Sequence, residues 1–467
     1  MNRSKKLYAL LGVLAAACIA TFAVMQMEER KEQIKNSDAM ILELSSASVQ
    51  SLSWEYNGES LSFHKDEVWL YDEDENFPIS EEKINELLEQ FQSFGAAFII
   101  ENVEDYGQYG LDAPICTIHL STAEQTYEVK LGDYSKMDSQ RYVSIGDGNV
   151  YLVKHDPLDE YDVVLSDMID HDEIPSFDHV TQIKFEGAEA YSIAYQEGST
   201  DTYSAGDVYF TQQNSKNLPL DTSKVESYLR SITNLNPVNY VSYNVTDEEL
   251  QTYGLDAPEL TITVDYTTEG EDGEEIANTF VLYVSPDPED VKAAEEAEDD
   301  HQDADIPAYI RVGESQIVYK ISSNYYKTLA AAAYHDLRHS EVIWADFSDF
   351  QQMDISLEGA SYTLTSKKAG DERTWAYQEK DALEISDLQS ALEALTAEEF
   401  TDERPTQKEE ISLMIRLDNE NFPQVEIKFY RYDGNRCLAV VDGKSVSLVD
   451  RAAVVDLNEA VYAIVLD

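Results

Sequence analysis

The sequence predicts an α+β protein in which three tandem repeats follow an N-terminal transmembrane helix. The main observation is that the same landmarks recur three times in the same order, and that each recurrence combines short strand-like runs with one helix-like run. Adjacent short strands joined by tight turns imply mainly antiparallel pairing. The length of 467 residues agrees with three units, because a domain typically holds about 150 residues.

The first predicted element is an uncharged apolar run over residues 7–25. As a helix it is about 28 Å long, which is enough to cross a bilayer. Basic residues precede the run and the segment after it is balanced in charge, so the positive-inside rule leaves residues 1–6 cytoplasmic and the bulk of the chain extracytoplasmic. Cleavage as a signal peptide near Ala15 or Ala17 is the alternative. The apolar run continues past both residues, which favours a single-pass anchor in the cell membrane, with residues 26–40 as a linker.

Each repeat is predicted to open with a strand whose apolar residues face one side of a sheet. Repeat 1 covers residues 41–173, repeat 2 covers residues 174–343 and repeat 3 covers residues 344–467. The corresponding strand positions are Val49, Leu52 and Trp54 in repeat 1, Val180, Ile183 and Phe185 in repeat 2, and Phe350, Met353 and Ile355 in repeat 3.

One amphipathic helix follows in each repeat, with apolar residues spaced i, i+3, i+4 and i+7 so that one face packs on the sheet of its own repeat. The three sets are Ile84, Leu87, Leu88 and Phe91; Val225, Tyr228, Leu229 and Ile232; and Leu388, Ala391, Leu392 and Leu395. The predicted N-caps are Ser80, Asp221 and Ser386. Short alternating strands then return, as in residues 142–151 and 309–319, where a glycine between two runs indicates a hairpin.

The longest repeated motif is Tyr-Gly-Leu-Asp-Ala-Pro, at residues 109–114 and again at residues 253–258. Acidic residues before each copy suit the positive end of a short helix. The glycine stands where a helix needs a left-handed C′ residue, the leucine supplies the apolar C″ contact, and the proline prevents continuation. The sequence therefore predicts a structural motif that ends a helix and begins a strand, made of Tyr109, Gly110, Leu111, Asp112 and Pro114 in repeat 1 and Tyr253, Gly254, Leu255, Asp256 and Pro258 in repeat 2.

In the alternative interpretation of this motif, Asp112 and Asp256 are ligands in equivalent pockets. Repeat 3 lacks the motif, which favours the structural interpretation.

The composition excludes some classes of function. Apolar residues make up 43% of the chain and 30 residues are Tyr, which is enough to form real cores. Asp and Glu number 92 against 33 Lys and Arg, a formal net charge of −59. A field of this sign repels phosphate backbones, so nucleic acid is excluded as a partner. The acidity is typical of a solvated surface, and an acidic insertion at residues 287–305 of repeat 2 is expected to be a loop.

No constellation in the sequence predicts a catalytic, cofactor-binding or metal-binding residue. His335 and His339 have the i, i+4 spacing of a zinc-protease helix, but Asp336 stands where such a site uses Glu, and a third ligand is missing. A structural helix end is favoured there. The sequence contains neither a nucleophile elbow nor a phosphate-binding loop, and the acids at 156–162 lack the calcium-loop pattern. We expect a protein that is not an enzyme; a hydrolase with dispersed carboxylates stays open, because 92 acids allow any pairing.

Cysteine and tryptophan are predicted to be structural. Cys116 and Cys437 are far apart in non-equivalent contexts, which favours buried thiols over a long-range disulfide. The four Trp residues and many Tyr residues are also able to line a glycan groove. Their alternating placement in strands favours core packing instead.

The N-terminal anchor, the Tyr-Gly-Leu-Asp-Ala-Pro motif after a short helix and the Asp336-Leu337-Arg338 step before the third opening strand resemble the bacterial domain-of-unknown-function family DUF4340. The resemblance runs from about Ile41 to the C-terminus. Repeat 1 departs from it at Asp167-Met168-Ile169, and repeat 3 lacks the Gly-Leu motif. The resemblance implies an extracytoplasmic protein without an assigned activity, whose relatives are often encoded beside ABC-type export permeases and gliding-type auxiliary proteins.

These observations together predict a scaffold or accessory protein whose partner is a membrane protein such as a transporter permease. A cell-surface module that binds glycan or cations is the alternative. The resemblance supplies no catalytic residue, and no cofactor is expected.

Overall fold

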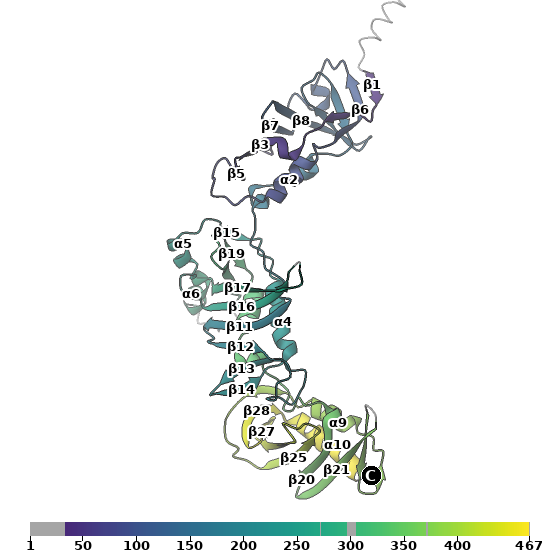
Figure 1. Cartoon of the computed structure of the whole chain (residues 1–467), viewed down its shortest axis with the longest axis vertical. Coiled ribbons are helices and arrows are strands. Elements are labelled where there is room, and N and C mark those ends of the chain that lie inside the picture. The colour runs from purple at the N-terminus through teal and green to yellow at the C-terminus, as the bar shows by residue number, and fades with distance from the viewer. Residues whose placement is uncertain (1–32, 271, 297–304, 370–371, 467) are drawn as a thin grey trace, which may run out of the picture. The chain divides into compact units, whose positions relative to one another are not determined.

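The computed structural model describes residues 33–270, 272–296, 305–369 and 372–466. The chain forms two compact units, Met1–His171 and Asp172–Asp467. The first unit contains one sheet, which belongs to repeat 1, and the second contains the sheets of repeats 2 and 3 (Figure 1). The predicted transmembrane segment at residues 7–25 lies outside the described residues. Within the described residues, no helix is both long enough and apolar enough to cross a membrane.

All strand pairs of the first sheet are antiparallel, and its order is β5-β4-β3-β7-β8-β9-β10-β6-β1, with β2 paired to β6. Its strands are β1 (Gln33–Asn36), β2 (Met40–Leu42), β3 (Val49–Tyr56), β4 (Glu59–Lys65), β5 (Trp69–Tyr71), β6 (Phe94–Glu101), β7 (Cys116–Thr122), β8 (Thr126–Ser135), β9 (Gln140–Ser144) and β10 (Val150–Val153).

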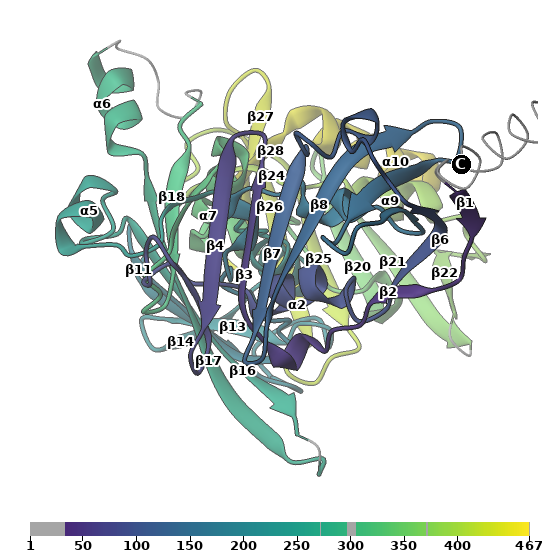
Figure 2. The same ribbon diagram turned by 90° about the horizontal axis from the view of Figure 1, so that it is seen from above.

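The sheet of repeat 2 has the order β14-β13-β12-β11-β16-β17-β18-β19-β15. Its strands are β11 (His179–Gly187), β12 (Tyr191–Tyr195), β13 (Tyr209–Gln213), β14 (Lys216–Pro219), β15 (Tyr240–Ser242), β16 (Leu260–Glu269), β17 (Glu275–Pro286), β18 (Ala308–Val312) and β19 (Val318–Ile321). The β16–β17 hairpin pairs out to Glu269 and Glu275, beyond the last partner of β11, and extends past the neighbouring strands (Figure 2).

The sheet of repeat 3 has the order β23-β22-β21-β20-β25-β26-β27-β28-β24. Its strands are β20 (Phe350–Leu357), β21 (Ala360–Ala369), β22 (Glu372–Tyr377), β23 (Lys380–Asp381), β24 (Ala397–Phe400), β25 (Glu409–Leu417), β26 (Gln424–Arg431), β27 (Arg436–Val441) and β28 (Lys444–Asp450).

The three orders describe one topology. The opening strand (β3, β11 or β20) lies inside its sheet, between the next strand along the chain and the strand that begins the second half of the repeat. The chain crosses through a helix to β6, β15 or β24, which pairs with the last strand of the repeat. The α+β class and the three predicted repeats are therefore confirmed.

The opening strands match residue by residue. Each has a register shift against its partner at the same point, after Val49, Val180 and Phe350. A β-bulge of this kind bends and twists a strand, so its recurrence marks equivalent geometry. The predicted inward positions are all buried, namely Val49, Leu52, Trp54, Val180, Ile183, Phe185, Phe350, Met353 and Ile355.

The predicted helices are α2 (Glu81–Glu89), α4 (Thr222–Thr233) and α9 (Ser386–Glu393). Ser80 Oγ accepts the Lys83 N–H at 3.3 Å, and Asp221 Oδ1 accepts the Ser223 N–H at 2.9 Å, as expected of N-caps. The prediction for Ser386 was wrong: it is the first residue of α9, and Ile385 precedes it without a side-chain cap.

Each repeat also contains a second helix after its last strand, so the prediction of one helix per repeat was wrong. These helices are α3 (Leu158–Tyr161), α7 (Ser323–Ala330) and α10 (Arg451–Val465). Buried tyrosines join the two helices in two repeats: Tyr161 Oη donates to Leu87 O at 3.0 Å, and Tyr228 Oη donates to Leu329 O at 2.8 Å. In repeat 3, apolar residues of α9 and α10 share one core cluster.

The acidic insertion is not simply a solvated loop. Asp287 is only 5% exposed, and its Oδ2 accepts hydrogen bonds from Tyr309 Oη and Lys320 Nζ, each at 2.8 Å. Helix α6 (Pro288–Glu296) follows, because Ala, Glu and Lys are good helix formers. The acidic composition predicted neither the buried Asp287–Lys320 pair nor helix α6. Residues 297–304 lie outside the described part of the chain.

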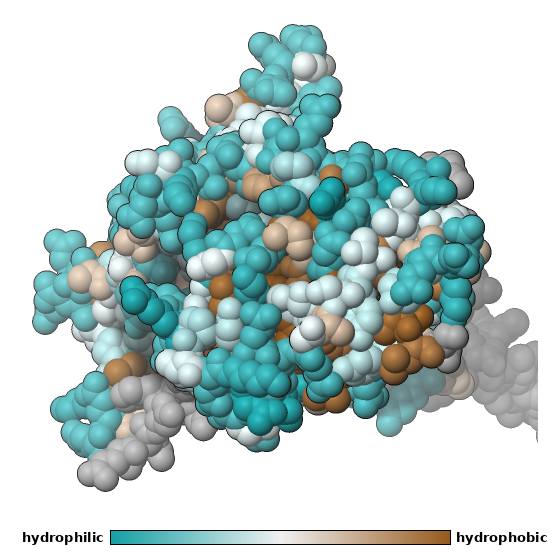
Figure 3. Space-filling model, turned by 90° about the horizontal axis from the view of Figure 1, so that it is seen from below, coloured by the Kyte–Doolittle hydropathy of each residue, from teal (hydrophilic) through white to brown (hydrophobic). Residues whose placement is uncertain are grey.

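The shorter elements are η1 (Ser46–Ser48), η2 (Gly107–Tyr109), η3 (Leu165–Met168), α5 (Asp247–Thr252), α8 (Tyr334–Leu337) and η4 (Phe347–Asp349). On the face drawn in Figure 3, hydrophilic residues cover most of the surface and hydrophobic residues form small patches between them.

Candidate functional site

Both copies of the repeated motif end a short helical turn. Gly110 follows η2 and Gly254 lies two residues beyond α5, and both have φ of 70°. The Leu111 N–H donates to Tyr106 O at 3.1 Å, and the Leu255 N–H donates to Leu250 O at 2.8 Å. These are the long-range bonds of a Schellman cap, in which a left-handed residue reverses the chain and satisfies the last carbonyls of the helix.

The apolar residues of the motif pack against the sheet. Leu111 and Leu255 are buried within small clusters of their own repeats. The Tyr109 ring lies 4.9 Å from Tyr142, and the Tyr253 ring lies 4.7 Å from Tyr309. The motif therefore fastens the link between β6 and β7, or between β15 and β16, to the end of the sheet.

The polar residues of the motif lie differently. Asp112 and Asp256 are exposed, while Pro114 and Pro258 are half-buried just before β7 and β16. The structure thus places the two aspartates on the surface of separate links.

A second repeated device attaches the end of a repeat to its first helix. The Asp167 carboxylate accepts the Val164 N–H and the Asp336 carboxylate accepts the Ala333 N–H, both at 3.0 Å. One residue further on, Met168 O accepts the N–H of Ser80 at 2.9 Å. In repeat 2, Leu337 O accepts the N–H of Asp221 at 3.0 Å, which brings the chain after α8 beside the N-terminus of α4.

The two histidines of the predicted helix end do not share a helix face. Helix α8 ends at Leu337, and Arg338 is extended, with φ of −78° and ψ of 164°. The side chain of His335 is 65% exposed, whereas that of His339 is 11% exposed. His339 therefore belongs to the segment that leads into repeat 3.

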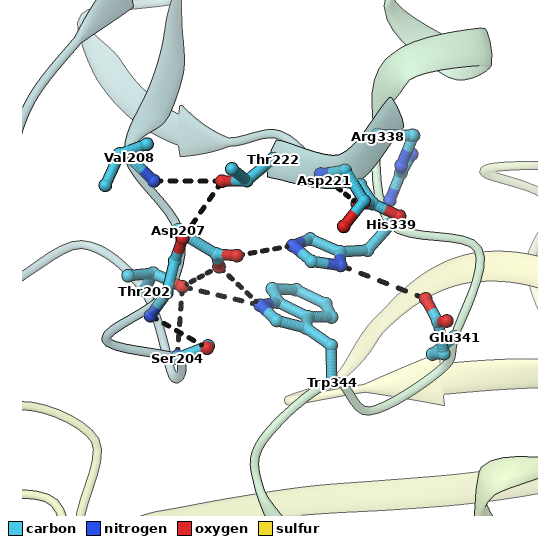
Figure 4. A network of polar contacts seen from close by, with 12 residues as sticks. Thr202, Ser204, Asp207, Val208, Asp221, Thr222, Arg338, His339, Glu341 and Trp344 are labelled. Carbon is cyan, nitrogen blue, oxygen red and sulfur yellow. Dashed lines mark hydrogen bonds and ion pairs between the residues drawn. The ribbon is translucent and has the colours of Figure 1, made fainter. Parts of the chain in front are cut away.

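The His339 imidazole is held by Asp207 of repeat 2 at its edge and by Trp344 on its face (Figure 4). Nε2 lies 3.0 Å from Oδ1 of the buried Asp207. Oδ2 of Asp207 accepts the indole N–H of Trp344 at 3.1 Å and the hydroxyl of Thr202. The indole and imidazole rings are stacked, with centroids 4.6 Å apart and planes 5° apart. The ring of His339 is thus fixed by two neighbours.

The other ring nitrogen faces two carboxylates. His339 Nδ1 lies 3.8 Å from Glu341 Oε2, an ion-pair distance too long for a hydrogen bond. Asp221 completes the group, and one ligand atom from each of Asp221, His339 and Glu341 lies within 4.8 Å of the other two. We call these three residues the junction cluster.

The charges in the junction cluster are strongly coupled. Burial would lower the pKa of His339. The hydrogen bond to Asp207 and the interaction with the Glu341 carboxylate outweigh this effect and raise the pKa to about 9. In turn the imidazolium lowers the pKa of Glu341 to about 2. At neutral pH the cluster therefore holds one positive charge among carboxylates.

The same segment is fastened to repeat 3. Val342 N–H donates to Leu395 O at 2.9 Å, and Ala397 N–H donates to Ser340 O at 2.7 Å. The ring of Tyr203 in repeat 2 packs on Trp344 at 5.0 Å and on Phe422 at 4.8 Å. Residues 338–344 consequently form the connection between repeats 2 and 3.

The remaining candidate residues are mostly structural. Cys116 and Cys437 are buried free thiols, as predicted, and burial raises the pKa of both to about 12. Trp54, Trp69 and Trp375 are buried in cores, which leaves Trp344 as the tryptophan with a polar setting. Of the acids at 156–162, Asp156 pairs with the buried Arg141 at 2.6 Å.

A cavity of about 530 Å³ lies beside α6 and α7 in repeat 2. Its apolar lining includes Val291 and Ile306, and three carboxylates, of Glu259, Glu295 and Asp336, contribute to the wall. Two of these acids already have partners: Glu259 accepts the Tyr326 hydroxyl at 2.7 Å, and Asp336 accepts the Ala333 N–H.

The fold and the junction define this chain as an α+β tandem-repeat protein in which repeats 2 and 3 are joined through a side-chain network. It belongs to the family described as Domain of unknown function (DUF4340), whose model matches residues 69–208 and 211–414. The two matches begin at equivalent places, β5 and β13, so the family model spans the boundary between two structural repeats. No curated protein and no solved structure matches the chain.

The sequence analysis missed the junction cluster because Asp221 lies far from His339 and Glu341 in the chain. Asp221 was predicted as an N-cap and His339 as half of a histidine pair, whereas Asp207 and Glu341 gave no signal. One usable signal was the equivalence of Asp336-Leu337 with Asp167-Met168, which places the next residues beside the N-cap of the preceding helix.

Proposed function

We propose that this chain is a single-pass, membrane-anchored extracytoplasmic scaffold or accessory protein of an ABC-type membrane transport complex. The observation that carries the proposal is the triplicated sheet, in which each repeat buries a core of its own and repeats 2 and 3 are held together by the segment 338–344. Such an array supports a role in binding and positioning partners.

The membrane side of the proposal rests on the sequence. The apolar run at 7–25 has the length of a membrane-spanning helix, and the basic residues before it favour a cytoplasmic N-terminus. The excess of 92 acids over 33 basic residues suits a solvated extracytoplasmic surface. The resemblance to a family often encoded beside ABC-type export permeases supports a permease as partner.

The anchor is tested with the full chain carrying a C-terminal epitope. Alkaline carbonate should leave the chain in the membrane, and protease added to spheroplasts should destroy the epitope. Leu14→Arg together with Ile19→Arg should release the chain, because an arginine at the centre of a spanning helix costs about 2.5–3.5 kcal/mol. Leu14→Ala with Ile19→Ala is the matched control. Carbonate release of the unaltered chain, or a protected epitope, would contradict the topology.

The partner is tested by affinity purification of the chain from detergent-solubilised membranes of its own host. Permease subunits should be recovered with the full chain, and should be lost when residues 41–467 are replaced by an unrelated soluble domain behind the same anchor. Recovery that persists after this replacement would show capture by the anchor alone and would overturn the scaffold proposal.

A further inference from the structure

The junction cluster combines an imidazole nitrogen with two carboxylates in a form that suits a transition-metal ion. Zn²⁺ binds His nitrogen and carboxylate oxygen at about 2.0–2.2 Å, so the donor atoms of a tetrahedral site lie about 3.4 Å apart. The Nδ1–Oε2 separation of 3.8 Å between His339 and Glu341 is close to this value. A small rotation of the Glu341 side chain would bring the two atoms to this distance, while Asp207 and Trp344 hold the His339 ring.

Because His339 is protonated in the metal-free cluster, a bound metal ion would replace the proton on Nδ1. The rest of its surroundings are those of a prepared metal ligand. Metal-binding histidines almost always use their second nitrogen to bond a carboxylate or carbonyl, which fixes the ring and its tautomer. Asp207 does this here, because it is buried and holds Nε2 at 3.0 Å, which directs Nδ1 toward Glu341. The stacked indole of Trp344 holds the ring in the same orientation (Figure 4).

A second observation points to a ligand. The Glu341 side chain is 38% exposed, but its Oε2 atom is shielded from solvent and has no hydrogen-bond partner among the described residues; its charged neighbour is His339 Nδ1 at 3.8 Å. A buried carboxylate oxygen without a hydrogen bond is costly, and a bound cation would satisfy it. Asp221 adds a third donor from the N-terminus of α4, and its N-cap bonds to Ser223 and Lys224 hold it in place.

We propose that Asp221, His339 and Glu341 bind a divalent cation of the Zn²⁺ class, with Asp207 as the residue that positions the imidazole. The cation would link α4 of repeat 2 to the segment leading into repeat 3, and would therefore act on the connection between them. This inference goes beyond the scaffold proposal and does not depend on it.

The chain offers its own optical reporter for the test. Trp344 stacks on His339, whereas Trp54, Trp69 and Trp375 are buried in cores. Zn²⁺ added to the metal-free full chain in detergent should change the tryptophan emission. Excess Mg²⁺ is present throughout, because it occupies exposed carboxylates but does not replace a metal held by imidazole. Calorimetry under the same conditions should count one Zn²⁺ site more in the unaltered chain than in Glu341→Gln.

The variants distinguish a metal site from a simple ion pair. Asp221→Asn keeps the N-cap but removes a ligand charge, and should lose the site as Glu341→Gln does. Asp207→Asn should weaken Zn²⁺ binding about 10–100-fold, as expected of a residue behind a metal ligand. His335→Gln is the matched control and should bind as the unaltered chain does, while Trp344→Phe should lose the emission change but keep the calorimetric site.

Two outcomes would overturn the proposal of a metal site. If the unaltered chain, Asp221→Asn and Glu341→Gln bind the same number of Zn²⁺ ions with no specific change in Trp344 emission, the cluster is an ion pair only and the proposal is overturned. Loss of binding in His335→Gln would equally overturn it, because the metal would then lie elsewhere.

Discussion

Repeats 1 and 2 close one link of the fold differently from repeat 3. In the first two, the link from β6 to β7 or from β15 to β16 contains a helical turn, a left-handed glycine and a buried leucine. In repeat 3, residues 401–408 make this link without a helix. The corresponding end of the sheet in repeat 3 is covered by a cluster of Leu438, Val440 and Leu448 and by the Arg436–Glu399 ion pair at 3.0 Å.

All three sheets nevertheless have the same strand order. The difference teaches that the Tyr-Gly-Leu-Asp-Ala-Pro motif does not determine the topology. The motif stabilises a local link, and its loss in repeat 3 is offset by other packing at the same end of the sheet. Substitutions in the motif should therefore weaken repeats 1 and 2 locally and leave repeat 3 unchanged.

The largest effect is expected from Leu255→Ala. This change removes a buried side chain from the small cluster that contains Val245 and Val318, and should cost about 3 kcal/mol. Hydrogen exchange of the amides in 246–258 is the suitable measurement, because repeat 2 proper has no buried tryptophan to report its unfolding.

The companion change Leu111→Ala should act in the same way on repeat 1. Ile276→Ala, at a position 49% exposed in repeat 2, is the control and should change exchange little. Accelerated exchange in repeat 3 in either leucine variant would show that the motif supports the whole array.

The next largest effect is expected at the glycines of the motif, where substitution by alanine should cost more at Gly110 than at Gly254. Both have φ of 70°, where an L-residue costs about 1–2 kcal/mol. A Cβ on Gly110 would lie 2.9 Å from the backbone nitrogen of Asp133, which moves only with strand β8. A Cβ on Gly254 would lie 2.6 Å from Ser285 Oγ, which is able to rotate away. Gly110→Ala should thus cost about 2–3 kcal/mol, and Gly254→Ala should cost less.

Ser285→Ala tests the contribution of this hydroxyl directly. It should recover part of the loss in Gly254→Ala when exchange rates of the single and double variants are compared. Equal losses at the two glycines, with no recovery on removal of the Ser285 hydroxyl, would mean that backbone strain alone sets the cost.

Much of this fold follows from the sequence for a physical reason. Alternation in strands and the helical spacing of Val225, Tyr228 and Leu229 depend on local geometry that one chain segment displays. The second helices were harder to predict because α3 is a single turn. Helix α10 did carry a signal, since Val454, Leu457 and Val461 share one buried face. Its equivalent in repeat 1, α3, has only four residues, so comparison of the repeats adds nothing to this signal.

The junction cluster lay beyond such reasoning. Asp221 and His339 are brought together by the hydrogen bond from the Asp221 N–H to Leu337 O, which is a tertiary contact. Asp287 is a similar case: its acidic neighbours predicted exposure, whereas Tyr309 and Lys320 made burial possible.

A moderate and pH-dependent effect is expected from Asp287→Asn, at the buried residue between β17 and α6 of repeat 2. Burial would raise the pKa of this carboxyl, but hydrogen bonds from Lys320 and Tyr309 outweigh it and hold the pKa below its usual value. The carboxylate then stabilises the folded state above the unfolded pKa of about 3.9, and this contribution is lost as the pH falls through the folded pKa. At neutral pH the variant should lose about 1–2 kcal/mol.

Hydrogen exchange around α6 and β19, measured from pH 7 to pH 3, checks this prediction. The difference between the unaltered chain and Asp287→Asn should stay constant at higher pH and shrink below about pH 4. Glu289→Gln, which changes an exposed acid in helix α6, is the control and should show no such dependence. A gap that widened in acid would reverse the sign of the coupling.

The smallest effect is expected from Asp112→Ala and Asp256→Ala. Both aspartates are exposed on their links, and exposed substitutions away from caps and cores usually change stability by less than about 0.5 kcal/mol. Exchange and permease recovery should both be unchanged, because the cap depends on the glycine and leucine. Asp256→Asn, which keeps the shape without the charge, separates loss of charge from loss of size. If either alanine variant reduced permease recovery while exchange stayed unchanged, the aspartate would be a contact residue. The motif would then be a binding site carried by repeats 1 and 2 and absent from repeat 3, and the difference between the repeats would be functional rather than structural.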